Sequence, residues 1–338
     1  MHRIVPFTDD HVVGAAELLA ARHRRLRAGE PALGEKYGAP ETVRSIVESA
    51  AAVEGAHALA AVADGRLVGF LVGQPQDGFF WGRAAWVDLE GHATTDPALT
   101  VDLYAAWARH WVDRGAFHHY VTVPVGEPDQ LDIWFQLGFG QMQAYALRGT
   151  NTADLPLTPG VQVREATAAD ADFIAAVANV INAAQLDSPS FTPLPAEHHE
   201  LTVAQYLEEL RTGPDPWWVA VDATTGEPLG LSMSYDADDA LHTPPGAVYL
   251  GGTLTAPTAV RRGVARALLR HTLDRAAARG VGHCTTNWRT SNPSAARTWP
   301  ALGFRRTHIR LARRIDDRVA WATGPVRDRD PGAFRAAP

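Results

Sequence analysis

An internal repeat constrains this chain more than any other feature of its sequence. Four segments of the first half return in the second half, in the same order and at offsets that drift slowly from 159 to 165 residues. They are residues 134–139 (WFQLGF) with 299–304 (WPALGF), 114–115 with 279–280, 64–69 with 225–230, and Thr8 with Thr167. This pattern indicates one fold encoded twice with small insertions.

The length of 338 residues agrees with this interpretation, because one domain typically takes ~100–200 residues. Hydrophobic residues make up 46% and charged residues 20%, so each half can bury a core and the chain is not disordered. A stretch rich in Thr, Pro, Gly and Asp separates the halves. We therefore predict a first domain at 1–148, a linker at 149–160, a second domain at 161–315 and a tail at 316–338.

Each half repeats the same order of expected elements. A short strand leads to a helix opened by Thr8 or Thr167, and two apolar strands then flank a turn that contains glycine. A further strand, a long helix, a strand and a last helix–strand unit follow. This order predicts an α/β (α+β) fold with a mixed central sheet.

The charge and composition exclude several classes of protein. A net charge of −7 argues against nucleic-acid binding, and no apolar stretch approaches the ~20 residues that span a bilayer. The amino terminus becomes acidic before a signal peptide could form, and the single cysteine, Cys284, excludes a disulfide framework. We expect a soluble cytoplasmic monomer or homodimer with no metal site, no nucleic acid and no membrane partner.

The second half contains a turn suited to an anion. A strand at 247–255 precedes a glycine turn, and an amphipathic helix begins near Val264. The free backbone N–H groups at such a helix start suit a pyrophosphate, and three arginines, at 261, 262 and 266, add cationic donors. These residues alone leave a purely structural turn open. The chain has neither a Gly-x-Gly-x-x-Gly motif nor a P-loop, so nicotinamide and nucleoside-triphosphate enzymes are not favoured.

A third segment adds a resemblance to a known family. A strand at 284–289 leads to Asn292 and then to a short helix that ends in Leu-Gly-Phe at 302–304. Together with the turn, this resembles the GNAT acetyltransferase superfamily, and in particular tandem GNAT proteins common in high-GC actinobacteria. The resemblance implies two tandem GNAT folds. In that family a turn of the form Pro-x-x-Arg/Gln-x-x-Gly-x-Gly/Ala binds the pyrophosphate of acetyl-CoA, and the Asn-led helix flanks the pantetheine arm.

The resemblance therefore implies acetyl-CoA as co-substrate and assigns it a set of residues. They are Thr253, Leu254 and Thr255 on the strand, Arg261, Arg262, Gly263, Val264, Ala265 and Arg266 in the turn and helix start, and Asn292 and Arg297 in the second motif. Val260 stands where the family usually has Gln or Arg. A turn that binds through backbone N–H groups tolerates this change.

The first half departs from the family at the matching place. Residues 87–97 include Asp88, Glu90 and Asp96 and lack the glycine turn. Because carboxylates repel a pyrophosphate, we expect a degenerate GNAT domain there and one acetyl-CoA per chain.

Members of the family transfer the acetyl group directly from the thioester to an amine. The resemblance therefore implies an N-acetyltransferase that acts on a small-molecule amine, with a backbone N–H of residues 253–255 stabilising the oxyanion. Tyr249 is the candidate catalytic residue, since it stands near the place where some members carry a glutamate. It would line the acceptor site or relay a proton, and a packed strand tyrosine is the alternative. Cys284 is expected to be an inert buried thiol.

Several residues weaken or complicate the catalytic interpretation. Trp299 stands where many members have a tyrosine that protonates the leaving thiolate, and an indole N–H cannot supply that proton. Trp288 fits either the site or the core. Polar residues near the predicted acceptor region, each interpreted first as surface, are Asp236, Asp238, His242, His198 and His199. A non-catalytic GNAT-like protein that binds or senses an acyl-CoA therefore remains the alternative, followed by an unrelated α/β protein that uses the turn as a helix cap.

Overall fold

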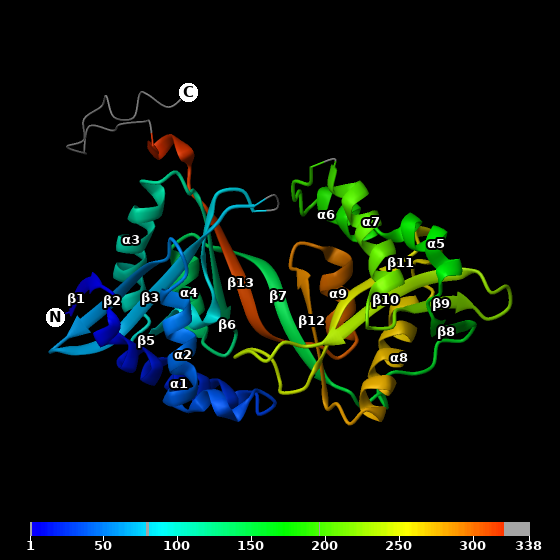
Figure 1. Ribbon diagram of the computed structural model, residues 1–338, viewed down its shortest axis with the longest axis horizontal. Helices are drawn as coiled ribbons and strands as arrows, with labels where there is room; N and C mark the ends of the chain where they lie inside the picture. The colour runs from blue at the N-terminus through cyan, green and yellow to red at the C-terminus, as the bar shows by residue number, and fades with distance from the viewer. Residues whose placement is uncertain (1, 79–80, 196, 321–338) are drawn as a thin grey trace. The chain divides into compact units, whose positions relative to one another are not determined.

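The computed structural model describes residues 2–78, 81–195 and 197–320. The chain divides into two compact units (Figure 1). Unit 1 comprises Met1–Met142 and His308–Pro338, and unit 2 comprises Gln143–Thr307. The predicted tail is described only as far as the short 3-10 helix η6 (Asp317–Ala320), and its residues 321–338 lie outside the described residues.

Unit 1 is built on a mixed sheet with strand order β1-β2-β3-β4-β6-β13, and β5 pairs with β3. Its strands are β1 (His2–Pro6), β2 (His57–Ala63), β3 (Arg66–Gln76), β4 (Ala84–Val87), β5 (His92–Thr94), β6 (His118–Pro124) and β13 (Arg305–Arg314). Its helices are η1 (Asp9–His11), α1 (Val12–Gly29), η2 (Glu35–Gly38), α2 (Pro40–Ala51), η3 (Leu89–Gly91), α3 (Leu99–Val112) and α4 (Pro128–Gln136). Only β4 and β6 pair in parallel.

Unit 2 has the corresponding strand order β7-β12-β11-β10-β9-β8, with β11 and β12 parallel. Its strands are β7 (Gly140–Gly149), β8 (Val161–Glu165), β9 (Trp218–Asp222), β10 (Pro228–Asp236), β11 (Val248–Thr255) and β12 (His283–Arg289). Its helices are η4 (Ala168–Asp170), α5 (Ala171–Val177), α6 (Val180–Leu186), α7 (Glu197–Thr212), η5 (Pro257–Ala259), α8 (Val264–Ala278) and α9 (Pro293–Ala301). The predicted apolar face of α8 is buried through Leu268, Leu269 and Leu273.

The register of the two sheets confirms the internal repeat. Gly69 pairs with Thr94 in unit 1, and Gly230 pairs with Thr255 in unit 2, so both partners shift by 161 residues. Trp86 of β4 lies beside Tyr120, and the equivalent pair in unit 2 is Tyr249 beside Thr285. The same side-chain positions therefore recur in both units, which allows them to be compared residue by residue.

The last strand of each unit comes from the other half of the sequence. Residues 143–149 of β7 pair with β12 in unit 2, and residues 308–314 of β13 pair with β6 in unit 1. Ile309 and Leu311 consequently lie in the core of unit 1, whereas Ala144 and Ala146 lie in a core of unit 2. The unit boundaries therefore differ from the predicted ranges 1–148 and 161–315, because each of these strands ends a repeat in sequence but belongs to the other unit's sheet.

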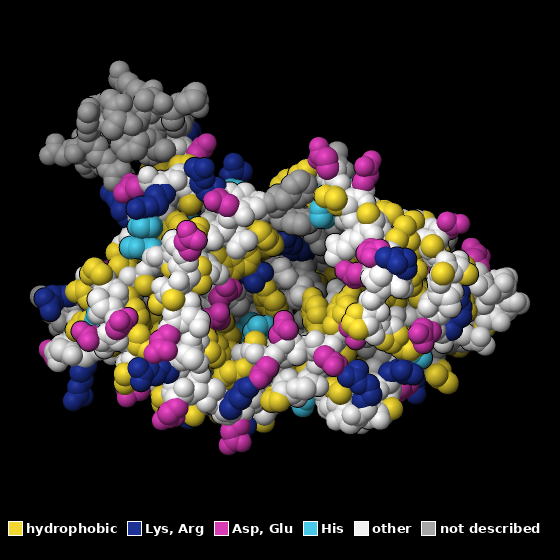
Figure 2. All heavy atoms as spheres, viewed as in Figure 1, with side chains coloured by type: hydrophobic (Ala, Val, Ile, Leu, Met, Phe, Trp, Pro, Cys, Tyr) yellow, Lys and Arg dark blue, Asp and Glu magenta, His cyan; other side chains and the backbone are white. Residues whose placement is uncertain are grey.

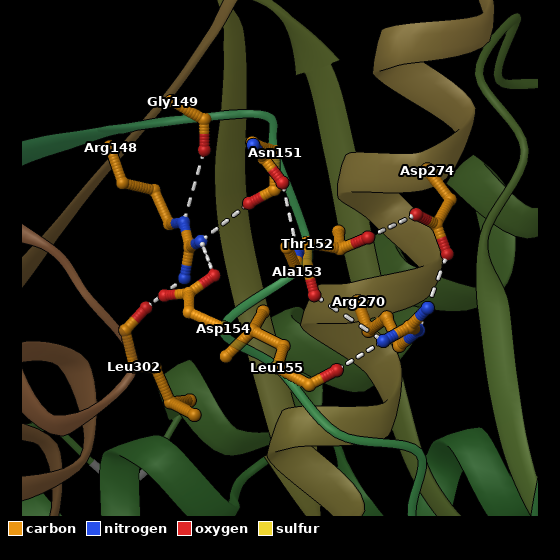
Figure 3. Close-up of polar contacts among 10 residues, drawn as sticks. All are labelled: Arg148, Gly149, Asn151, Thr152, Ala153, Asp154, Leu155, Arg270, Asp274 and Leu302. Carbon is orange, nitrogen blue, oxygen red and sulfur yellow. Dashed lines mark hydrogen bonds and ion pairs between the residues drawn. The ribbon is translucent and has the colours of Figure 1, made fainter.

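An arginine on each exchanged strand lies beside the Leu-Gly-Phe turn of its unit. In unit 2, the buried Arg148 donates hydrogen bonds to the carbonyl of Leu302, to the carbonyl of Asn151 (2.8 Å) and to Asp154 Oδ1 (2.9 Å) (Figure 3). In unit 1 the equivalent Arg313 lies near the Gly138 turn, and its Nη1 is 3.3 Å from Tyr104 Oη.

The predicted linker runs along α8 and is fixed to it. Thr152 Oγ1 donates to Asp274 Oδ1 at 2.8 Å, and Arg270 donates to the carbonyl of Leu155 (Figure 3). Further along, Thr158 contacts the glycine turn that precedes α8. The linker is thus part of the packing of unit 2.

On the face shown in Figure 2, acidic and basic side chains are interspersed with hydrophobic ones over both units. None of the helices in the described ranges combines the length and apolar character needed to cross a membrane. Within the same ranges, no three His, Cys, Asp or Glu side chains gather as a metal site would require.

Candidate functional site

The glycine turn before α8 leaves the start of that helix open. Residue 263 caps the helix in the left-handed conformation with φ +77°, which glycine adopts at no steric cost. A Cβ at this position would also lie 2.9 Å from Thr158 Cγ2, so the turn excludes a side chain. Within the described residues, no side chain caps α8. Its first N–H groups, with the positive end of the helix dipole, are therefore available to an anion.

The three predicted cationic donors have different surroundings. Arg262 forms an ion pair with Asp222 at 2.6 Å, and its hydrogen bond lowers the pKa of that carboxyl to about 2. Arg266 Nε donates to Thr158 Oγ1 at 3.2 Å. Arg261 is exposed and makes no hydrogen bond or ion pair with any described residue. Arg261 is therefore the one of the three that is free to reach a phosphate.

The sheet opens beside this turn, between β11 and β12. The two parallel strands pair only at Val248 with Cys284 and at Tyr249 with Thr285, and Thr286 Oγ1 then donates to the carbonyl of Leu250 at 3.0 Å. Further along, Thr253, Leu254 and Thr255 pair with β10 but have no ladder partner on the β12 side among the described residues. Backbone groups on this edge of β11 are available to a ligand, as the predicted oxyanion donor requires.

The two residues of the second predicted cofactor motif, Asn292 and Arg297, have different surroundings. Asn292 caps α9, because its Oδ1 accepts hydrogen bonds from the N–H groups of Ser294 and Ala295 at 3.1 and 3.2 Å. Helix capping is therefore a sufficient reason for an asparagine at this position, whether or not a cofactor binds there. Arg297 is exposed on α9 and has no hydrogen-bond or ion-pair partner in the described part of the chain.

Tyr249 lies at the end of a short hydrogen-bond chain. Gln143 Nε2 donates to Asn287 Oδ1 at 2.7 Å, and Asn287 Nδ2 donates to Tyr249 Oη at 2.8 Å. Burial raises the pKa of the Tyr249 hydroxyl, which therefore stays protonated at neutral pH. Since its oxygen accepts from Asn287, the hydroxyl proton remains free for donation. The geometry supports a positioning or relay role and excludes direct proton abstraction by Tyr249.

A second tyrosine and a glutamate beside Tyr249 were not predicted from the sequence. Tyr235 on β10 is the cross-strand partner of Tyr249, and its hydroxyl donates to Glu209 Oε2 of α7 at 3.3 Å. Gly251 makes room for both rings, because a Cβ there would lie 2.8 Å from Tyr235 Cε2 and 3.3 Å from Tyr249 Cε1. The alternation of β10 could have suggested Tyr235, but no sequence pattern places Glu209 of α7 against it.

The other candidate residues lie on the surface or contact neighbouring protein groups. Asp236 forms an ion pair with Arg279 at 2.6 Å, Asp238 is exposed, and the ring of His242 lies 5.9 Å from that of Tyr145. The carbonyls of His198 and His199 accept hydrogen bonds within the α6–α7 region. Trp288 and Trp299 are buried in the same core cluster as Cys284, and burial raises the pKa of the Cys284 thiol to about 12. Such a thiol is inert at neutral pH.

In unit 1 the equivalent opening is filled by the protein itself. His92 occupies the position of Thr253, is buried, and donates from Nε2 to the carbonyl of Thr122 on β6 at 2.9 Å. At the start of α3, Asp96 Oδ1 accepts a hydrogen bond from the N–H of Ala98 at 2.9 Å. A carboxylate therefore stands at the helix start where unit 2 leaves the N–H groups open.

Comparisons with known proteins agree with the fold described above. Residues 181–304 match the sequence profile of the family described as "Acetyltransferase (GNAT) family". A tandem GNAT protein from the clavulanic acid biosynthesis pathway is 17% identical, with a TM-score of 0.50 over 93% of this chain and 98% of the other. The chain has a tandem GNAT fold.

Two further structures share this fold. A GCN5-related N-acetyltransferase from Sphaerobacter thermophilus is 15% identical, with a TM-score of 0.56 over 93% of this chain and 95% of the other. A GNAT-family acetyltransferase from Colwellia psychrerythraea is 13% identical, with a TM-score of 0.50 over 93% of this chain and 100% of the other. A search of curated proteins found no match. The stretch that matches the family profile lies within unit 2 and contains the open turn.

Proposed function

We propose that unit 2 binds acetyl-CoA and transfers its acetyl group directly to the amine of a small molecule. The observation that carries this proposal is the uncapped start of α8 beside the unpaired edge of β11. The turn supplies N–H groups and the exposed Arg261 for the pyrophosphate. The β11 edge runs from this turn toward Tyr249, so a pantetheine arm laid along it would bring the thioester toward the two tyrosines.

The chemistry requires a neutral amine, an oxyanion donor and a leaving thiolate. The amine nitrogen attacks the thioester carbon, a backbone N–H of β11 stabilises the oxyanion, and the carbon–sulfur bond then breaks. We assign Glu209 as the general base that accepts the amine proton. The proton would pass through the hydroxyl of Tyr235, because this hydroxyl and the Glu209 carboxylate form a hydrogen-bonded pair beside Tyr249. Tyr249, fixed by Asn287, orients the acceptor.

One observation favours a second candidate, a non-catalytic protein that binds an acyl-CoA. Trp299 is buried where the family often has a tyrosine acid, and its indole N–H cannot protonate a thiolate. Direct transfer therefore requires the thiolate to leave unprotonated or to take its proton from water. A coenzyme A thiolate is a good enough leaving group for either course.

A screen of amine acceptors distinguishes the two functions. The protein is mixed with acetyl-CoA and a panel of amino acids, amino sugars and polyamines, and free thiol release is followed with a thiol reagent. The proposal predicts release that depends on one class of amine and that falls in Glu209→Gln by about 10²–10⁴-fold, the range for one general base. The matched control is Glu208→Gln, since Glu208 is the exposed neighbour on α7. Tight acetyl-CoA binding without release for any amine would favour the binding protein.

A further inference from the structure

Unit 1 contains a cavity of about 350 Å³ that the proposed function does not use. The end of α2 forms one wall, and the ends of β3 and β4 with the segment after β4 form the other. Its polar lining residues are Ser45, Ser49, Gln74, Asp88 and Glu90, and Trp86 is among its apolar lining residues. The volume suffices for a small organic molecule.

The two carboxylates in this cavity are only partly satisfied by the protein. Asp88 accepts hydrogen bonds from Trp86 Nε1 at 2.9 Å and from Gln74 Nε2 at 3.3 Å. Glu90 makes no ion pair with any described residue. Each carboxylate therefore has acceptor capacity left on the side of the cavity.

Burial is the dominant influence on both carboxylates. It raises the pKa of Asp88 against the opposing charge of Arg310. Burial and the neighbouring Asp88 charge raise the pKa of Glu90, against a hydrogen bond from its own backbone N–H and the opposing charge of Arg22. Both arginines already have other contacts. Arg22 donates to the carbonyls of Leu89 and His92, and the guanidinium of Arg310 lies 4.1 Å from the centroid of the Trp86 ring.

Helix α2 adds a second, independent source of negative potential. The helix ends at Ala51, and its last turns, which include Ser49, line the cavity. The free carbonyls and the negative end of the helix dipole at such a terminus favour a cation. The helix terminus and the carboxylates thus point to the same ligand charge.

We propose that this cavity binds a small organic cation, with an ammonium group between Asp88 and Glu90 and an apolar body against Trp86. Three donors of an ammonium match the free acceptor capacity of the two carboxylates. The indole beside them suits the adjoining methylene groups. An acidic cavity of this kind is unsuited to a phosphate-bearing ligand, so the site is distinct from the acetyl-CoA site proposed in unit 2.

Isothermal titration of the full chain with n-butylammonium, at physiological salt and without acetyl-CoA, tests this proposal. We expect saturable binding at one site per chain, and no saturable binding of butyrate or n-butanol. Glu90→Gln and Asp88→Asn should each weaken binding about tenfold or more, as expected for the loss of a charge-assisted contact. Glu17→Gln removes the same charge from an exposed position on α1 and should leave the affinity within about twofold.

Two further variants test whether butylammonium occupies this cavity and whether its binding is independent of the acetyl-CoA site. Ser49→Phe changes an exposed residue that lines the cavity, so it should block binding while the thermal unfolding midpoint stays close to that of the parent. Gly263→Glu in unit 2 should leave butylammonium binding intact, which separates this site from acetyl-CoA binding. The proposal is overturned if butylammonium does not saturate at tens of millimolar. It is equally overturned if Glu90→Gln, Asp88→Asn and Ser49→Phe all bind butylammonium as well as the parent does.

Discussion

The two units carry the same fold but differ beside the start of their long helix. Among the described residues of unit 2, no side chain caps α8, and the buried Oγ1 of Thr253 on the adjacent strand has no hydrogen-bond partner. In unit 1 the Asp96 carboxylate accepts from the backbone just before α3, and His92, at the position of Thr253, bridges to β6. Burial lowers the pKa of His92 to about 3, so the bridge is made by a neutral imidazole.

This difference shows how a repeated fold can keep its packing and change its chemistry. Unit 1 places a carboxylate beside the start of its long helix and bridges the strand edge with His92, whereas unit 2 has neither feature at the equivalent positions. These differences lie on β5 and in the segment before α3, at His92 and Asp96. In a duplicated chain, binding capacity is therefore better judged from the turn and strand edge than from fold similarity.

The largest expected effect is on acetyl-CoA binding to the open turn. Gly263→Glu places a side chain against Thr158 and a carboxylate at the start of α8, which imitates the charge that Asp96 supplies in unit 1. We expect affinity for acetyl-CoA to fall at least about a hundredfold in a titration. Gly280→Glu is the matched control, because Gly280 is also left-handed (φ +78°) and has open space around it. Equal losses in both variants would remove the turn from the site.

The strand exchange predicts a large and asymmetric effect on stability. Arg148→Ala removes a buried side chain and leaves the carbonyls of Leu302 and Asn151 and the exposed Asp154 carboxylate without their donor. We expect the free energy of unfolding to fall by about 3 kcal/mol in a denaturant titration. The equivalent Arg313→Ala in unit 1 should cost less, because Arg313 is half-exposed. A smaller loss for Arg148→Ala than for Arg313→Ala contradicts this account.

The helix start near residue 167 predicts a pH effect on the stability of unit 2. The same capping box uses Asp170 in unit 2 and His11 in unit 1. Arg164 hydrogen-bonds to Asp170 at 2.6 and 2.8 Å and lowers the pKa of that carboxyl below its ordinary value. The stability from this carboxylate is present above its unfolded pKa of ~4 and is lost as the pH falls through its lower folded pKa.

Asp170→Asn should therefore cost about 1 kcal/mol at pH 7, and the difference from the parent should shrink as the pH falls below about 4. Denaturant titrations across this range check the prediction. Asp172→Asn, an exposed change in the same helix start, should show no such dependence. A constant difference at all pH values would show that Asp170 acts through packing rather than charge.

The smallest expected effect on turnover is that of Trp299→Phe. The equivalent Trp134 in unit 1 is fully buried and packs on Phe139, as Trp299 packs on Phe304. Unit 1, whose equivalent opening is occupied by His92, keeps a tryptophan at this position. We therefore interpret Trp299 as a residue that packs in the core and has no catalytic role. Trp299→Phe should leave turnover within a few-fold of the parent, and Trp299→Ala should lower stability by about 3–5 kcal/mol. If folded Trp299→Phe that still binds acetyl-CoA loses orders of magnitude in turnover, the indole N–H has a direct role.

The repeat, the order of elements, the buried face of α8 and the left-handed Gly263 turn could all be predicted from the sequence, because each depends on local pattern. The strand exchange could not, since an alternating strand such as β7 does not specify which sheet it joins. The long-range partners of individual side chains could not be predicted from the sequence for the same reason. Nothing local pairs Arg262 with Asp222 or places Glu209 beside Tyr235.

The stoichiometry of acetyl-CoA binding tests the central claim, that one unit keeps an open site and the other has filled it, most directly. Isothermal titration of the full chain should give one site per chain, and Gly263→Glu should abolish it. A stoichiometry near two, or one site that survives Gly263→Glu but is lost when Asp96 or His92 of unit 1 is replaced, would contradict the account.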